Sequence, residues 1–224
     1  MFTVLCSDLD CGAKMKNILC FGDSNTWGYS PQDGTRFSPD VRWTGVLQKS
    51  LGNGYHIIEE GLNGRTTFIN EEGEGGRPLR SGSDVLQVIL ESHRPLDFVT
   101  IMLGTNDLKL EFNLSVEEIA LGAKELCETV LNSEYLADNV PQILLISPTH
   151  IGSTIMPDQE EFFNQAREKS HQFAEHYQKI ANDLNIHFLD ASKIVTPSDG
   201  EGVHWDAEQH IKFGKYLAET IKKY

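Results

Sequence analysis

The chain has 224 residues, of which 39% are hydrophobic, and a formal net charge of −14. This length suffices for one buried core, and the negative charge argues against nucleic acid or an anionic membrane surface as a partner. The sequence has no apolar run of membrane-spanning length, and its four cysteines lack the CxxC spacing of a zinc site. We therefore expect a cytoplasmic globular protein with reduced thiols and neither a metal nor another cofactor.

The N-terminal residues 1–14 precede the first predicted strand. They lack the basic segment and the long apolar stretch of a signal peptide. We expect a poorly ordered extension there. Residues 15–224 are predicted to form a single domain, because no linker composition interrupts them.

The first predicted strand is the unbroken apolar run at residues 18–21, a pattern typical of a strand buried on both faces. Gly22 ends the run, and the next residues, Asp23 and Ser24, favour a helix N-terminus. This order predicts a Ser24 hydroxyl at the carboxyl edge of a sheet, beside unpaired N–H groups that can receive an anion. Ser24 is therefore a candidate nucleophile, although an isolated Gly-Asp-Ser more often only caps a helix.

The remaining elements alternate between strand and helix patterns. Strands are predicted at residues 55–59, 97–103, 142–147 and 186–189. Helices are predicted at residues 41–51, 83–91, 115–131, 160–184 and 207–223. Exposed or irregular loops are predicted at residues 29–40, 68–81 and 148–159. This alternation predicts a parallel sheet with helices on both faces.

Four candidate site residues follow four of the predicted strands. Ser24 follows the first strand, Gly64 the second and Asn106 the third, and His204 lies in the loop after the fifth. Ligands of such sheets bind beyond the carboxyl ends of the strands. We therefore expect a hydroxyl, a backbone N–H, a side-chain amide and an imidazole on one rim, which together make a reaction centre.

Four sequence blocks lie at these strand ends: GDS at 22–24, GLNG at 61–64, GTND at 104–107 and EGVH at 201–204. In this order they resemble the blocks of the SGNH (GDSL) hydrolases, a family of serine esterases. From about residue 15 onward, tracts such as FGDSNTWG, IMLGTND and EGVHW are most similar to the arylesterase/acyltransferase branch. The resemblance implies a flavodoxin-like, three-layer α/β/α sandwich with a five-stranded parallel sheet.

The resemblance also implies a role for each of the matching residues. Ser24 attacks the ester carbonyl, and His204 takes its proton and returns one to the leaving alcohol. The N–H groups of Ser24 and Gly64 and the side-chain amide of Asn106 form the oxyanion hole. Glu201 orients His204. Water then hydrolyses the acyl-enzyme, or another alcohol accepts the acyl group.

The chain departs from the family pattern at two positions. Asn25 follows the nucleophile where the family name has Leu, a change that we expect to leave the chemistry intact. Glu201 stands where the family has Asp, three residues before His204. The spacing favours Glu201 as the third member of the triad, with Asp199 and Asp206 as the alternatives.

The substrate is predicted only as a class. Aromatic and polar residues near the rim, namely Trp27, Asn63, Phe68 and Trp205, are predicted to bind substrate, although the aromatic ones are equally compatible with packing. The family resemblance implies a small ester with a short acyl chain. Sugar acetates, aryl acetates and small alkyl esters all remain open, as does self-association into a homo-oligomer.

Two other functions are compatible with parts of the sequence. A flavodoxin-like protein could bind the phosphate of FMN at residues 22–26, but this alternative leaves Asn106 and His204 without a role. An interaction scaffold with a decayed site is disfavoured, because Ser24, Asn106 and His204 are all present. The esterase therefore accounts for the largest share of the motifs.

Overall fold

The fold of the chain is a five-stranded parallel sheet between two layers of helices. The computed structural model describes residues 14–71, 77–163 and 165–224, so most of the predicted N-terminal extension lies outside the described residues. The sheet has the order β2-β1-β3-β4-β5. Its strands are β1 (Lys16–Gly22), β2 (Tyr55–Gly61), β3 (Phe98–Met102), β4 (Gln142–Ser147) and β5 (His187–Asp190). The predicted fold class and all five predicted strands are confirmed.

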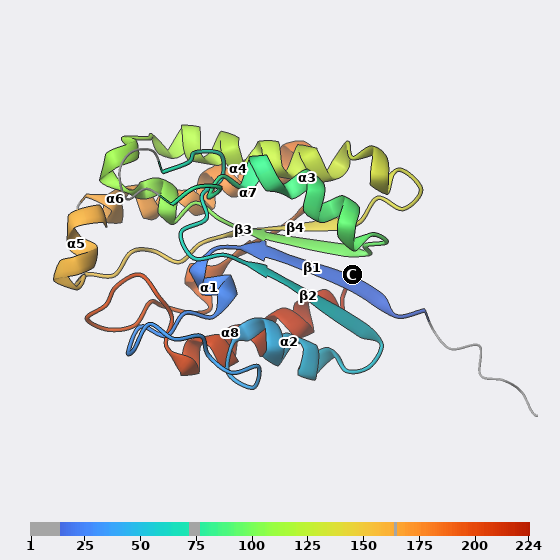
Figure 1. Ribbon diagram of the computed structural model, residues 1–224, viewed down its shortest axis with the longest axis horizontal. Helices are drawn as coiled ribbons and strands as arrows, with labels where there is room; N and C mark the ends of the chain where they lie inside the picture. Colours follow the sequence, from blue (N-terminus) through green and yellow to red (C-terminus); the bar gives the residue numbers. More distant parts are fainter. Residues whose placement is uncertain (1–13, 72–76, 164) are drawn as a thin grey trace, which may run out of the picture.

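Helices cover both faces of the sheet (Figure 1). On one face lie α3 (Gly82–His93), α4 (Val116–Leu131) and α7 (Phe173–Leu184), and on the other lie α2 (Trp43–Leu51) and α8 (Ala207–Ile221). The shorter helices are α1 (Ser24–Trp27), α5 (Pro157–Phe163) and α6 (Ala166–Ser170). Single 3₁₀ turns are η1 (Asn106–Leu108), η2 (Leu110–Phe112), η3 (Glu134–Leu136) and η4 (Ala191–Lys193).

Strand β1, between β2 and β3, is apolar on both sides because each side faces a separate core. Leu19 and Phe21 pack into the cluster beneath α3, α4 and α7. Ile18 and Cys20 pack into the cluster beneath α2 and α8. All four side chains are at most 1% exposed. Burial from both faces stabilises this strand and gives a rigid base to the turn that follows it.

The single helix predicted over residues 160–184 is wrong. The segment forms α5, α6 and α7, and Gln165, between the first two, has a φ of 71°. A residue in this left-handed conformation cannot continue a right-handed helix. The predicted irregular segment at 148–159 also ends early, since α5 begins at Pro157. As a result, α5 and α6 lie at the end of the molecule toward which the strands point (Figure 1).

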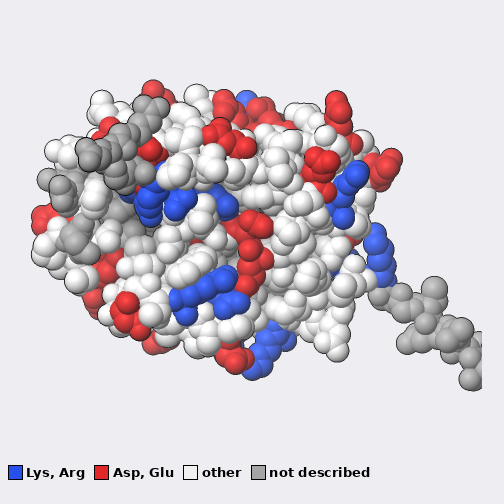
Figure 2. Space-filling view, in the orientation of Figure 1, with Lys and Arg blue, Asp and Glu red and all other residues white. Residues whose placement is uncertain are grey.

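The charged groups are distributed rather than gathered in one patch on the face shown in Figure 2, where acidic and basic side chains alternate over the surface. Among the described residues, no helix combines the length and the apolar character needed to cross a bilayer.

Candidate active site

The turn between β1 and α1 places Ser24 at the carboxyl edge of the sheet. The carboxylate of Asp23 accepts the N–H of Asn25 at 3.0 Å and so caps the first turn of α1. A Cβ atom on Gly61, at the end of β2, would lie 2.1 Å from the backbone nitrogen of Trp27. Glycine at this position therefore lets α1 lie directly against β2, and Ser24 is held with only 7% of its surface exposed.

A hydrogen-bonded series links Ser24, His204 and Glu201. The Ser24 Oγ lies 2.9 Å from His204 Nε2, and His204 Nδ1 lies 2.6 Å from Glu201 Oε1. Glu201 Oε2 also accepts the backbone N–H of Val203 at 2.9 Å and that of His204 at 2.6 Å. Gly202, with a φ of 82°, makes the tight turn that brings a carboxylate back onto an imidazole three residues later.

The charge of Glu201 is stabilised by its neighbours. Burial alone would raise the pKa of this carboxyl, but the hydrogen bond and charge of the His204 ring and the backbone N–H donors lower the pKa below its ordinary value. An ionised Glu201 accepts a hydrogen bond from the N–H group at Nδ1 and so leaves Nε2 free to accept the Ser24 proton. This arrangement can activate a hydroxyl as a nucleophile.

Asn106 and Gly64 line the same cavity as Ser24. Asn106 opens η1, which follows β3 after a short turn, and donates one side-chain N–H to the carbonyl oxygen of Arg65 at 3.0 Å. The other N–H of that amide remains for a ligand. The structure therefore brings together all five residues predicted as the catalytic group and the oxyanion hole: Ser24, Gly64, Asn106, Glu201 and His204.

Asp107 joins the Asn106 turn to the loop after β2. Its carboxylate accepts the backbone N–H of Thr67 at 2.9 Å and also the Thr67 hydroxyl. Burial raises the pKa of Asp107 to about 6, although the hydrogen bonds from Thr67 oppose this shift. The local sequence does not reveal this contact, because the partner lies 40 residues away.

The cavity in front of Ser24 has a volume of about 540 Å³. Its lining comprises Ser24, Tyr29, Asn63, Gly64, Glu71, Arg77, Asn106, Lys109, Glu111, Gln159, Phe162, Phe163, Val203 and His204. Phe162 and Phe163 come from α5, so the break in the predicted long helix supplies one wall of the site.

Only Asn63 among the four predicted substrate-binding residues lines this cavity. The prediction for Trp205 is wrong, because its side chain is 0% exposed in the core and its indole N–H donates to Thr149 Oγ1 at 3.0 Å. Trp27 lies beneath the Arg36 guanidinium, and Phe68 lies against α4. All three aromatic side chains therefore pack within the protein, which was the alternative to substrate binding.

One wall of the cavity is charged, which the sequence did not predict. The Glu71 carboxylate accepts Nε of Arg77 at 2.9 Å and Nη2 at 2.8 Å, and it also accepts the Lys109 ammonium group. These bonds, that of Arg77 above all, lower the pKa of Glu71 to about 2 despite its burial. The sequence predicts an exposed or irregular loop at residues 68–81, but the Glu71 side chain within it is only 8% exposed. The wall therefore presents fixed polar groups to a ligand.

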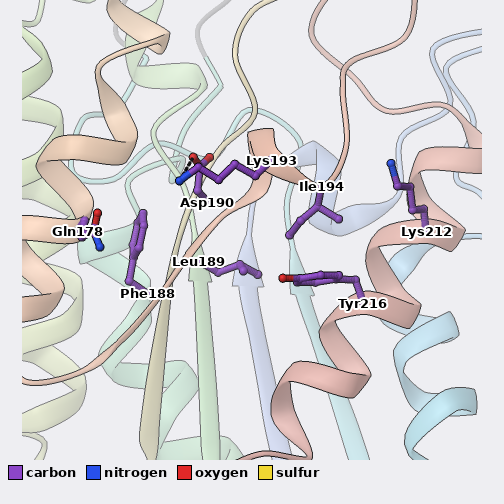
Figure 3. A pocket seen from close by; sticks show the side chains of 8 residues that line it. All are labelled: Gln178, Phe188, Leu189, Asp190, Lys193, Ile194, Lys212 and Tyr216. Atoms are coloured by element: carbon purple, nitrogen blue, oxygen red, sulfur yellow. Dashed lines mark ion pairs between the residues drawn. The ribbon is translucent and has the colours of Figure 1, made fainter.

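A second cavity, of about 420 Å³, lies beside the edge strand β5. Figure 3 shows its lining, which includes the ion pair of Lys193 with Asp190 at 3.6 Å and the ring of Tyr216. No serine, cysteine or histidine is among its lining residues in the described chain. The chemistry of the molecule is therefore assigned to the cavity at Ser24.

Comparisons with known proteins agree with this geometry. The sequence profile of the GDSL-like lipase/acylhydrolase family matches residues 20–213. A carbohydrate acetylesterase from Sinorhizobium meliloti is 35% identical with a TM-score of 0.87, over 93% of this chain and 99% of that chain. The inhibitor-bound aryl esterase of M. smegmatis is 37% identical with a TM-score of 0.87, over 93% and 99% of the two chains. Among curated protein sequences, none matched.

Proposed function

Because the chain belongs to the GDSL-like lipase/acylhydrolase family and is a carboxylic ester hydrolase, we propose that it hydrolyses small aryl or alkyl esters with short acyl chains. The reaction proceeds through an acyl-enzyme on Ser24. The observation that carries this proposal is the series of hydrogen bonds from Ser24 to His204 at 2.9 Å and from His204 to Glu201 at 2.6 Å. This hydrogen-bonded series gives a role to His204, which the flavin-binding alternative leaves without one.

Each group in the site has a defined step in this mechanism. The Ser24 Oγ attacks the ester carbonyl carbon while its proton passes to Nε2 of His204. Glu201 stabilises the imidazolium ion that results. The oxyanion of the tetrahedral intermediate accepts hydrogen bonds from the N–H groups of Ser24 and Gly64 and from the Asn106 amide. His204 then protonates the departing alcohol, and water or a second alcohol repeats the sequence on the acyl-enzyme.

Replacing Asn106 by alanine is expected to lower kcat by about 10²–10³ while leaving KM within about twofold, since loss of one oxyanion donor acts mainly on the transition state. Steady-state kinetics with p-nitrophenyl acetate measure this split. Asn139→Ala is a matched control, because Asn139 also donates a side-chain N–H to a backbone carbonyl, that of Leu96 at 2.7 Å, outside the cavity. An unchanged kcat in Asn106→Ala would show that its amide only supports the turn.

The charged wall supports a second candidate, a carbohydrate O-acetyl esterase of the same fold. Glu71, Arg77 and Lys109 offer donors and acceptors that suit the hydroxyl groups of a polyol better than a long hydrocarbon chain. The carbohydrate acetylesterase from Sinorhizobium meliloti, at 35% identity, is consistent with this substrate class.

Turnover of two ester series tests both candidates. With p-nitrophenyl acetate, butyrate and octanoate we expect kcat/KM to fall as the acyl chain lengthens, because the polar wall cannot accept the added methylene groups without desolvation. With acetates of a phenol, a simple alkyl alcohol and a monosaccharide, the preferred alcohol distinguishes the two candidates. Octanoate as the best acyl group would contradict the short-chain proposal, and no turnover of any ester would contradict the hydrolase mechanism.

A further inference from the structure

The side chain of Asn25, the residue after the nucleophile, is hydrogen-bonded to backbone groups of the two residues that flank His204. Its side-chain Nδ2 donates to the carbonyl oxygen of Val203 at 3.3 Å. Its Oδ1 accepts the backbone N–H of Trp205 at 3.0 Å. One side-chain amide therefore binds the peptide groups that immediately precede and follow His204, about 180 residues along the chain.

We propose that Asn25 is a positioning residue that fixes the His204 imidazole relative to the Ser24 hydroxyl. Asn25 is 4% exposed and lies in the first turn of α1, where its own N–H is held by Asp23. Any movement of the histidine segment away from Ser24 must break one or both bonds to the Asn25 amide. The proposal rests on the hydrolase mechanism above, since it concerns how the base is held.

Apart from the bond between His204 and Ser24 itself, the other hydrogen bonds of the histidine segment do not supply this link. Glu201 orients the ring, but it belongs to the same short segment and moves with it. The carbonyl oxygen of His204 accepts the N–H of Ser198, and that of Gly202 accepts the N–H of Gly152. Neither of these partners belongs to the turn that carries Ser24. The Asn25 amide joins the two segments at the point where their distance decides proton transfer.

The ring of Tyr29 also packs against the ring of His204, with centroids 4.2 Å apart. A ring contact of this kind restricts the tilt of the imidazole but allows the ring to slide. A hydrogen-bond donor and an acceptor bound to the backbone on either side of His204 fix the position of that residue. We therefore assign the distance between Ser24 Oγ and His204 Nε2 chiefly to Asn25. A leucine there, as in the family name, has similar size but can make neither bond.

Asn25→Leu is expected to lower kcat on p-nitrophenyl acetate by about 10- to 100-fold, because a misplacement of about 1 Å in a catalytic group can cost about 10² in rate. KM should stay within about twofold, since Asn25 does not line the cavity. The rate at which a fluorophosphonate labels Ser24 should fall by a similar factor, because that reaction also needs His204 as the base.

Gln48→Leu is the matched control. The Gln48 side chain makes the same kind of paired contact, donating to the carbonyl oxygen of Tyr55 and accepting the N–H of Ile57, both at 2.9 Å, around a different histidine. These residues are at the amino end of β2, opposite the site. Gln48→Leu should lower Tm while leaving kcat and the labelling rate unchanged.

Two outcomes decide the proposal. A lower kcat and labelling rate in Asn25→Leu, with Gln48→Leu unaffected at a similar loss of Tm, would support it. A kcat within about twofold of wild type would overturn it, as the amide would then have only a structural role. If Asn25→Leu does not fold, Asn25→Ser, a smaller change that retains a polar group, provides the same comparison. Labelling of the wild type at Ser24 separately tests the hydrolase mechanism, so the two failures are distinguishable.

Discussion

Ser24→Ala is expected to lose about 10⁶ in kcat and all covalent labelling, the largest effect of any single change in this chain. The nucleophile, its base and the acid that orients the base act as one unit, so removing the attacking atom removes nearly all of their joint contribution. The oxyanion donors and the binding cavity stay, and they account for any residual rate. Turnover of p-nitrophenyl acetate and mass spectrometry after fluorophosphonate treatment measure the two losses.

The wild type should carry one label per chain, on the peptide that contains Ser24. Cys20 and Cys127 do not compete for the probe, because both are buried and burial raises the pKa of each thiol, that of Cys20 to about 12. Ser24 is the first residue of α1, so loss of a helix-terminal serine needs a control of its own.

Ser115→Ala provides that control. Ser115 caps α4, accepting the N–H of Glu118 at 3.2 Å in a capping box outside the cavity. Its removal should cost about 0.5–2 kcal/mol of stability and leave kcat unchanged. Undiminished labelling of Ser24→Ala would show that the nucleophile lies elsewhere. An equal loss of activity in Ser115→Ala would show that the loss in Ser24→Ala comes from the helix end and not from the attacking atom.

The sequence predicts the strands and the rim well because both depend on local patterns. The run at residues 18–21 is apolar without interruption, a pattern typical of a strand buried on both faces. Ser24, Asn106 and His204 then follow strand ends, and parallel strands bring their carboxyl ends to one edge. No long-range contact has to be known to place them together.

The errors arise where a distant partner decides the outcome. Trp205 lies one residue from His204 in the chain, but its ring packs in the core, where Thr149 satisfies its N–H. Glu71 belongs to a Glu-rich stretch that is typical of a solvated loop, but in the fold Arg77 and Lys109, the latter 38 residues away, both donate to its carboxylate. Asn25 was expected to leave the chemistry intact, because its two partners lie at the other end of the chain, and the variant Asn25→Leu tests that expectation.

The break in the predicted helix over residues 160–184 has a more local cause. The amphipathic pattern continues through Gln165, a residue type that favours helices, so periodicity alone predicts one element. The left-handed conformation at Gln165 instead redirects the chain, and α5 then contributes Phe162 and Phe163 to the cavity wall.

Glu201→Gln is expected to lower kcat by about 10⁴, the second-largest effect, while Asp199→Asn and Asp206→Asn stay near wild type. Glu201 Oε1 lies 2.6 Å from Nδ1 of His204, whereas Asp206 caps α8 by accepting the N–H of Gln209 at 3.0 Å. Asp199 is exposed. None of the three changes alters the size of the side chain, so they are matched with one another.

The loss in Glu201→Gln has a specific chemical reason. A glutamine that donates its N–H to Nδ1 stabilises the tautomer with the proton on Nε2, and this nitrogen then cannot accept the Ser24 proton. Labelling of Ser24 should therefore persist at a lower rate rather than disappear. Kinetics on the three variants beside wild type, with labelling rates, give both measurements.

The pH dependence of stability provides an independent check on Glu201. Its pKa is lowered in the folded protein, so its contribution is present above the pKa of the unfolded state, about 4.3, and is lost as the pH falls through the lower, folded value. The stability advantage of wild type over Glu201→Gln should therefore hold at neutral pH and shrink in strong acid, as measured by denaturant unfolding across that range. If Asp199→Asn were the variant with the collapsed kcat, and Glu201→Gln kept both its activity and the wild-type stability at neutral pH, Glu201 would have no part in orienting His204.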